Sequence, residues 1–518
     1  MNTMSKLQKD YDSLYKKYAS LQNDLFDRKE KYRNLQQSYQ YLEKTIENKV
    51  EKAVDVYCKD LMKENEELKL EVSRLKKLLN QDSNNSGVPT SKTPINKEKR
   101  ISNSREKSDK TIGGQPGHPK HNLKTFNNDE ITDTYIYEAT KCSCGSHNLT
   151  DKGIKTTKDS LDVDIRVMKI RNVFKKHKCN DCGKEFDVPI PNNLKEENQY
   201  GDNVKALAIS LVNEGCVSFN RTRKLIQGFT HNQINMSEGY IVKLQKVCSN
   251  GLETFINELK QNIIQSPIVH WDDTVIDIDT KRSFLRFYGT EELALYTAHE
   301  TKGKIGLDED CILDNLSEDT VVVHDHNKVN YNETYLFDDA ECCVHVIRDM
   351  TELKEILKHK WFDEMITLLT NTNNLRKVEI EKGNGYFDNV FVEEVMDKYD
   401  KILITAKEEN KKDYSKHCGN DEKSLIDRLI KYKRNYLMWV IRFDIPFDNN
   451  LSERSLRMSK TKQKVSGQFK NIENARYYAN IRSYIETCKR NDINEHQAII
   501  KLLNGKPYSI FEILKNED

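Results

Sequence analysis

Apolar residues recur at intervals of three and four through residues 1–80, and no glycine or proline interrupts them. Two apolar positions in every seven form a narrow stripe, which suits a partner helix better than a whole domain. We therefore expect a coiled coil that joins chains into a homo-oligomer; a single long helix docked on its own domain is the alternative. The stripe consists of Leu7, Tyr11, Leu14, Tyr18, Leu21, Leu25, Tyr32, Leu35, Tyr39, Leu42, Ile46, Leu68, Val72, Leu75 and Leu79.

The periodicity is lost over residues 81–135, where Ser, Asn, Pro, Gly and Lys are frequent. Nine Lys or Arg and three Asp or Glu fall within residues 92–124. Because such a segment cannot bury enough apolar surface to offset its ordering entropy, we expect a basic flexible linker. Its charge could also neutralise the phosphates of a nucleic acid.

A helical period returns over residues 193–262. Ser237, followed by Tyr240, Ile241 and Leu244, is a helix-start signal and resembles the second helix of a helix-turn-helix unit. A small helical packing unit without DNA contact explains the same pattern. If this unit binds DNA, its candidate contacts are Arg221, Arg223 and Lys224.

Short apolar and alternating runs, typical of β-strands, occupy residues 263–348. They read IVHWDDTVIDID, SFLRFYG, LALYTAH and TVVVH. Helical periodicity covers residues 349–442 and resumes over residues 443–490 and the tail, residues 491–518. The pattern predicts a multi-domain chain that is mainly α with an α/β core.

Composition narrows the class of protein. The 518 residues allow roughly three or four domains. With 36% hydrophobic and 32% charged residues, and a mean hydropathy of −0.79, the chain resembles a multi-part protein with much solvated helix surface. Lys and Arg (83) nearly balance Asp and Glu (82), so any nucleic-acid affinity must come from local basic patches. The sequence lacks an apolar run of about 20 residues and a signal-peptide core, which argues against a membrane or secreted protein.

Two close cysteine pairs stand out among the 12 cysteines. Cys142 and Cys144 form the first pair, Cys179 and Cys182 the second, and a glycine follows each pair. Four thiolates on two turns can bind Zn²⁺ tetrahedrally, and the metal then supplies folding energy that a small domain lacks. We therefore expect a zinc ribbon over residues 136–192.

The zinc interpretation has alternatives. The first pair is one residue shorter than a Cys-x-x-Cys pair, so His147 or His177 is an alternative ligand. The 34 residues between the pairs include a strand-like alternation over residues 160–174. Reduced cysteines in ordinary packing would also account for the sequence.

Three acids have a context that suggests chemistry. Asp272 lies within a predicted strand, Asp325 ends another, and Glu453 lies at a predicted helix start. If the strands are neighbours, the three carboxylates can bind two Mg²⁺ or Mn²⁺ ions, which promote phosphodiester cleavage and joining. Among 82 acids, however, such a set can arise by chance, and Asn450 with Glu453 also fits a helix capping box. Competing or crowding neighbours are Asp273, Asp277, Asp279, His324 and His326.

The helix that follows Glu453 is basic. Residues 453–470 hold six Lys or Arg and one acid. A carboxylate at the head of a basic helix face suits a site in which neighbouring phosphates are neutralised, although a solvated basic face is the alternative. The candidate phosphate contacts are Arg454, Arg457, Lys460 and Lys464.

Taken together, these motifs resemble the transposases of the insertion-sequence-66 family over nearly the whole chain. The resemblance rests on the coiled coil, GGQPGH, the two cysteine pairs, WDDT, HD and CCVHVIRD. Its most specific part is DNNLSERSLR (residues 448–457), followed by KQKVSGQF and IRSYIETCKRNDIN.

The resemblance implies an RNase H-like catalytic domain with an Asp-Asp-Glu (DDE) triad, interrupted by a helical insertion. Asp272, Asp325 and Glu453 match the three acids. Cys342 and His345 match a Cys-x-x-His element, whose role stays open because a packed, satisfied histidine explains it equally well. The family often has Asp-Gly-Tyr with a second tyrosine after the second acid, whereas this sequence has Asp-His-Asn and a tyrosine only at position 331.

The activity implied is cleavage and strand transfer at the ends of a mobile element, with Mg²⁺ or Mn²⁺ in the active site. The partners implied are element-end and target DNA, further copies of the chain, and accessory transposition proteins. A bacterial, cytoplasmic, nucleoid-associated protein is expected. The rival hypotheses are a non-catalytic DNA-binding adaptor derived from a transposase, and a metal-dependent nuclease without strand transfer.

Overall fold

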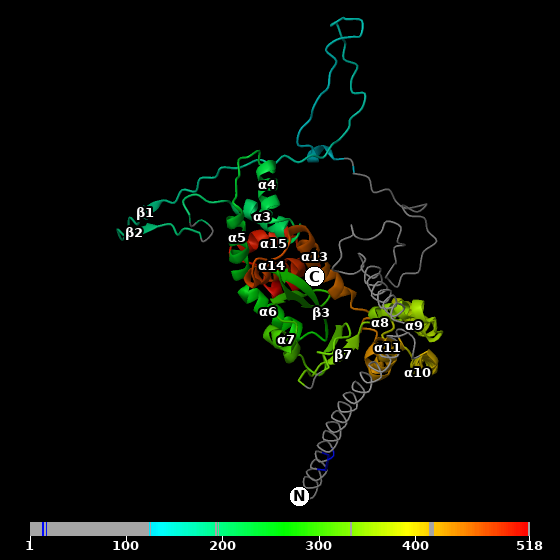
Figure 1. Cartoon of the computed structure of the whole chain (residues 1–518). Helices are drawn as coiled ribbons and strands as arrows, with labels where there is room; N and C mark the ends of the chain where they lie inside the picture. The colour runs from blue at the N-terminus through cyan, green and yellow to red at the C-terminus, as the bar shows by residue number, and fades with distance from the viewer. Residues whose placement is uncertain are drawn as a thin grey trace, which may run out of the picture. The chain divides into compact units, whose positions relative to one another are not determined.

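The computed structural model (Figure 1) describes residues 124, 126–191, 194, 196–331, 334–413 and 419–515, together with Ser13, Leu14 and Lys17. The chain divides into two units, Met1–Glu98 and Lys99–Asp518. Except for those three residues, the coiled coil predicted for residues 1–80 lies outside the described residues, as does most of the basic linker. The strands and helices below belong to the second unit.

A mixed β-sheet forms the centre of this unit, with the strand order β5-β4-β3-β6-β7. Its strands are β3 (Ile268–Ile278), β4 (Lys281–Gly289), β5 (Ala294–His299), β6 (Val321–His324) and β7 (Asp338–Glu341). β3 pairs antiparallel with β4 and parallel with β6, so the antiparallel and the parallel parts of the sheet join at β3. The sequence runs predict four of these strands; β7 reads Asp-Asp-Ala-Glu and gives no apolar signal.

Helices before and after the sheet form one hydrophobic core with one of its faces. Those before it are α3 (Asp202–Asn213), α4 (Phe219–Phe229), α5 (Glu238–Asn250) and α6 (Glu253–Ile264). Those at the carboxyl end are α14 (Ile472–Arg490), α15 (Glu495–Leu503) and α16 (Ile510–Leu514), and between β5 and β6 lie α7 (Lys304–Asp310) and η3 (Leu313–Asn315). They share a hydrophobic core with Val269 and Trp271 of β3 and Val322 of β6.

Serine hydroxyls begin two of the amino-terminal helices. Ser218 Oγ accepts a hydrogen bond from the Arg221 N–H at the start of α4, and Ser237 Oγ accepts one from the Tyr240 N–H at the start of α5. The helix start predicted at Ser237 is therefore confirmed.

The opposite face of the sheet carries α13 (Asn450–Ser466) and a helical insertion. The first part of α14 joins the core on this face, and its later part joins the core on the other face. Phe287 of β4 and Tyr296 of β5 pack against α13 and α14. Val321 and Val323 of β6 join the core of the insertion helices, which begin at Cys343, six residues before the predicted start at residue 349. The insertion consists of α8 (Cys343–Leu357), α9 (Trp361–Glu381), α10 (Asn389–Asp413), α11 (Gly419–Lys431) and α12 (Lys433–Ile441).

α14 also covers the edge strand β5. Ser483 Oγ accepts a hydrogen bond from the Tyr296 N–H at 2.8 Å, and Thr487 Oγ1 accepts one from the Ala294 N–H at 3.1 Å. These hydroxyls satisfy backbone donors that an uncovered edge strand would leave open to another chain.

The end of α13 is fixed to the end of β3. Gly467 ends the helix with a φ of 78°, a conformation that glycine adopts without strain. The Phe469 N–H then donates to the Asp277 carbonyl, and the Asp279 N–H donates to the Phe469 carbonyl. The Lys-x-Ser-Gly-x-Phe block thus holds α13 alongside the strand that carries Asp272.

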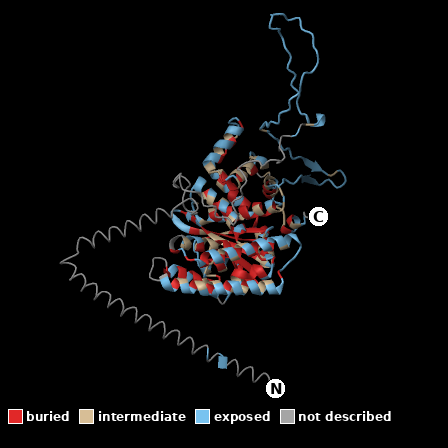
Figure 2. Ribbon diagram, turned by 90° about the vertical axis from the view of Figure 1, so that its right-hand side faces the viewer, coloured by how far each residue is buried: buried red, intermediate tan, exposed pale blue. Residues whose placement is uncertain are grey.

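Residues 126–191 contain little regular structure: η2 (Asn128–Glu130) and a short antiparallel pair, β1 (Lys176–Lys178) and β2 (Glu185–Asp187). The alternation over residues 160–174 predicts a strand, but these residues pair with no other strand within the described ranges. Val163 and Ile170 are 81% and 72% exposed, because an extended segment without a hydrogen-bonded neighbour buries neither face. Figure 2 shows the contrast between this exposed segment and the buried interior around the sheet.

None of the described helices combines the length and apolar character needed to cross a bilayer.

Candidate active site

Asp272 and Asp325 lie on neighbouring parallel strands. Asp272 is in β3, Asp325 directly follows β6, and paired residues of these strands differ by 53 in number, as in the pair Val269 and Val322. Continuing this register past the end of β6 places Asp325 opposite Asp272. Side chains at paired positions of parallel strands project from the same face, so both carboxylates lie on the face that α13 covers.

His345 connects Asp325 to Glu453. Glu453 is on the first turn of α13 and His345 on the first turn of α8. His345 Nδ1 lies 2.9 Å from Asp325 Oδ1, and its Nε2 lies 3.4 Å from Glu453 Oε1. Burial opposes the charged imidazole, but the contact with Asp325 and the charge of Glu453 outweigh it and raise the pKa of His345.

Asp272 is the third member of this group. Burial, followed by the negative charge of Asp325, raises the pKa of the Asp272 carboxyl well above its usual value. Asp273 and Glu453 act in the same direction. The register of β3 and β6 places Asp272 on the same face of the sheet as Asp325, so its carboxyl lies beside a second acid.

The capping-box interpretation of Glu453 is wrong. The cap of α13 is Asn449, one residue earlier than that interpretation requires, and α13 has no side-chain capping bond. The Glu453 carboxylate instead faces His345 of α8.

Asn449 holds three elements of the site together, a role that the sequence did not predict. Its side-chain amide donates to the Trp271 carbonyl at 2.9 Å, and its Oδ1 accepts from Ser452 Oγ at 2.9 Å. Its backbone N–H donates to Cys342 Sγ at 3.2 Å. Asn449 is fully buried, so these bonds fix β3, α8 and α13 relative to one another. Its place in the Asp-Asn-Asn run, directly before a helix, was the available signal.

The loop at Asp325 is held by a second polar network. His324 Nε2 lies 2.8 Å from Asp339 Oδ1, and His326 Nδ1 lies 2.7 Å from Glu341 Oε1. Tyr331 also donates to the Glu341 carboxylate. The Asp-His-Asn sequence with a later tyrosine is therefore accommodated by β7, which supplies both carboxylates.

The site fits a divalent cation. Asp325, Cys342 and His345 place one ligand atom each within 4.8 Å of one another, and no other such group of three occurs in the described part of the chain. Asp325 Oδ1, His345 Nδ1 and Glu453 Oε1 are buried atoms that make no hydrogen bond within the described residues. Buried polar atoms left in this way are costly unless a further partner binds. Carboxylate oxygens suit Mg²⁺ or Mn²⁺, whereas thiolate and imidazole suit softer ions such as Zn²⁺.

The neighbouring acids that competed with Asp272 have other contacts. Asp273 Oδ1 lies 3.1 Å from Lys302 Nζ, and Asp277 accepts a hydrogen bond from the Gln463 side chain at 2.6 Å. Asp279 lies exposed beyond the end of β3. Among these acids, Asp272 occupies the position of β3 that continues the register to Asp325.

The basic residues of α13 differ in exposure. Arg454, Arg457 and Lys464 are exposed, whereas Lys460 is partly buried. Burial lowers the pKa of Lys460, and the opposing charge of Asp272 acts on the same ammonium group. Lys460 thus lies on a helix that packs along β3, and the exposed cations remain accessible to a phosphate backbone.

The candidate DNA contacts of the helical segment before the sheet lie on α4. Arg221 and Lys224 are exposed and Arg223 is half-buried. None of the three forms an ion pair with the residues that the structure describes, so their charge is available to a partner.

The two cysteine pairs form similar turns. In the first, the Gly145 N–H donates to the Cys142 carbonyl; in the second, the Gly183 N–H donates to the Cys179 carbonyl. The backbone N–H of Cys144 lowers the pKa of Cys142. The backbone N–H of Cys182 likewise lowers the pKa of Cys179. Each turn therefore favours thiolate, although the structure does not bring the two pairs together within the described residues.

Comparison with known proteins agrees with this geometry. The model of the family described as "Transposase IS66 family" matches residues 198–477, which include all three acids and the insertion. A comparison with curated proteins found no match. Since the family match covers more than half of the sequence, the chain belongs to the IS66 family of transposases.

Proposed function

We propose that this transposase cuts and rejoins DNA at the ends of its element by DDE-type phosphoryl transfer. The proposal is supported by two observations: the register of β3 and β6 continues to Asp272 and Asp325, and His345 contacts both Asp325 and Glu453. Three strands or helices distant in sequence supply these carboxylates, and His345 spans two of them.

The strand arrangement supports an RNase H-like core. In the order β5-β4-β3-β6-β7, an antiparallel three-stranded part continues into two parallel strands. The first acid lies on the central strand, β3, and the second directly follows its parallel neighbour, β6. The helical insertion, α8–α12, separates the second acid from the third.

Asp272, Asp325 and Glu453 would hold Mg²⁺ or Mn²⁺, and two such ions supply activation of the attacking oxygen and stabilisation of the leaving oxygen. The chain's own groups position the reactants. Asn449 fixes the backbone beside Asp272, and His345 orients the other two carboxylates. Exposed cations of α13 would bind phosphates next to the scissile bond, so DNA binding should weaken as salt concentration rises.

The remaining parts of the chain have proposed roles in assembly and DNA binding. The turns at Cys142–Cys144 and Cys179–Cys182 would bind Zn²⁺ once both pairs meet, and α4 would contact element-end DNA. The coiled coil would join copies of the chain, and accessory proteins would complete the assembly.

The test is cleavage of supercoiled plasmid carrying the matching element ends, with and without Mg²⁺. Asp272→Asn should retain end binding and lose cleavage, because an amide binds a divalent cation poorly in place of a carboxylate. Asp279→Asn is the matched control, since this exposed acid lies in the turn that follows the same strand. Full cleavage by Asp272→Asn would refute the assignment, no cleavage by the unaltered protein would favour an adaptor, and cleavage without joined product would favour a nuclease.

A further inference from the structure

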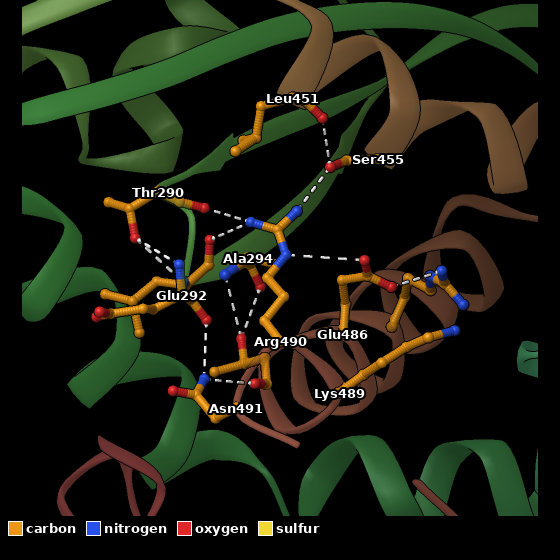
Figure 3. Close-up of polar contacts among 12 residues, drawn as sticks. Thr290, Glu292, Ala294, Leu451, Ser455, Glu486, Lys489, Arg490 and Asn491 are labelled. Carbon is orange, nitrogen blue, oxygen red and sulfur yellow. Dashed lines mark hydrogen bonds and ion pairs between the residues drawn. The ribbon is translucent and has the colours of Figure 1, made fainter. Parts of the chain in front are cut away.

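Arg490, at the end of α14, joins three separate parts of the chain (Figure 3). Its guanidinium donates to the carbonyls of Thr290 and Leu293, at the turn between β4 and β5, the latter at 2.9 Å. It also donates to Ser455 Oγ of α13 at 2.7 Å. The Ser455 hydroxyl in turn donates to the Leu451 carbonyl, so its oxygen is oriented to accept from Arg490.

These contacts lie next to two of the three acids. Ser455 follows Glu453 by two residues on the same helix. The guanidinium carbon lies 5.3 Å from the centre of the Phe287 ring, and Phe287 is the residue of β4 paired with Asp272. One side chain therefore touches the supports of both Asp272 and Glu453 without touching either carboxylate.

We propose that Arg490 is a positioning residue that sets the separation of Glu453 from Asp272 by tying α13 to the β4–β5 turn. This inference rests on the proposed function, and Arg490 lies outside residues 198–477, which the family model matches. An arginine suits the role because its planar fork donates in several fixed directions at once, whereas a lysine ammonium cannot span the same acceptors.

The proposal is tested by measuring Mn²⁺ binding to the full-length protein, with the electron paramagnetic resonance signal of free Mn²⁺ as the readout. Arg490→Met should weaken Mn²⁺ binding about tenfold and slow plasmid cleavage about 100-fold, because small displacements of supporting groups have effects of this order. Ser455→Ala removes only the acceptor on α13 and should move both quantities in the same direction. Arg490→Lys should recover only part of the binding.

Arg482→Met is the matched control. Arg482 is also buried on α14 and pairs with Glu486 and Glu214. Its loss should destabilise the fold while leaving Mn²⁺ affinity unchanged at a temperature where circular dichroism shows both variants folded. Arg490 and Glu486 lie 3.7 Å apart, so both arginines share this acid partner.

Asp272→Asn separates the two possible failures. If it abolishes Mn²⁺ binding while Arg490→Met and Ser455→Ala bind Mn²⁺ normally, the role of Arg490 is overturned and the proposed function stands. If Asp272→Asn binds Mn²⁺ normally, the proposed function fails and the role of Arg490 fails with it.

Discussion

His270 and Val323 are the last paired residues of β3 and β6, and Asp272 and Asp325 each lie two residues further along the chain. Continuing this register places two acids from distant parts of the sequence on one face of the sheet. Two neighbouring negative charges raise the free energy of the metal-free protein, and a bound cation lowers it again.

Asp272→Asn should stabilise the metal-free protein. Because the folded pKa of Asp272 is raised above the ordinary value of 3.8, the native state holds this proton more tightly than the unfolded chain does, and stability falls as pH rises between the two values. Removing the charge should raise the free energy of unfolding at pH 7 by about 0.5–2 kcal/mol. Urea denaturation in EDTA measures this free energy of unfolding. Equal stability of the variant and the unaltered protein would contradict the prediction. The control, Asp279→Asn, should change stability little.

Zn²⁺ or Cd²⁺ should inhibit Mg²⁺-dependent cleavage through Cys342. Its sulfur lies within 4.8 Å of ligand atoms of Asp325 and His345, a set that soft cations favour. Cys342→Ser should raise the inhibitory concentration about tenfold, the order seen when a group supporting a metal site is lost.

Cys343→Ser is the control for that experiment. Cys343 is equally buried but donates to the Tyr436 carbonyl and accepts from Trp439, away from the acids. Equal inhibition of both variants would show that the soft cation binds elsewhere.

Asn449→Ala should lose both stability and cleavage. The substitution leaves the Trp271 carbonyl and Ser452 hydroxyl without their partner, and an unsatisfied buried group costs about 1–3 kcal/mol. Chemical denaturation and the plasmid assay measure the two losses. Asn450→Ala, at the exposed next position, should change stability and cleavage little. Similar losses in both variants would argue against a linking role for the Asn449 side chain.

Neutralising α4 should weaken DNA binding and its dependence on salt. If Arg221 and Lys224 contact phosphates, replacing each with alanine should lower the slope of log affinity against log salt by about one. Binding to an element-end duplex across a salt series tests this. Lys398→Ala, which removes an exposed cation of α10, should leave the slope unchanged.

The purified protein should contain one zinc ion per chain. Cys144→Ser and Cys182→Ser should each release it, because a tetrahedral site with one ligand removed binds the ion weakly. Cys311→Ser, which alters an exposed cysteine outside the pairs, should retain the metal. Metal analysis decides the point, and a zinc-free, folded unaltered protein would refute the zinc ribbon.

The sequence by itself determined the local elements and the motifs. Apolar periodicity located four of the five strands, the helices of the insertion and the helix start at Ser237, because side-chain spacing along one element reflects which face is buried. The motif spacing also led to the IS66 family, which the comparison confirmed. The polar strand β7 left no such trace.

Only the tertiary structure decided which side chains meet. Glu453 faces His345 rather than capping its own helix, Asn449 links three elements, and Arg490 reaches α13 from α14. Each of these contacts joins residues that are far apart in the chain or on different elements. Local periodicity carries no information about such contacts, because they depend on strand register and on how helices pack against the sheet.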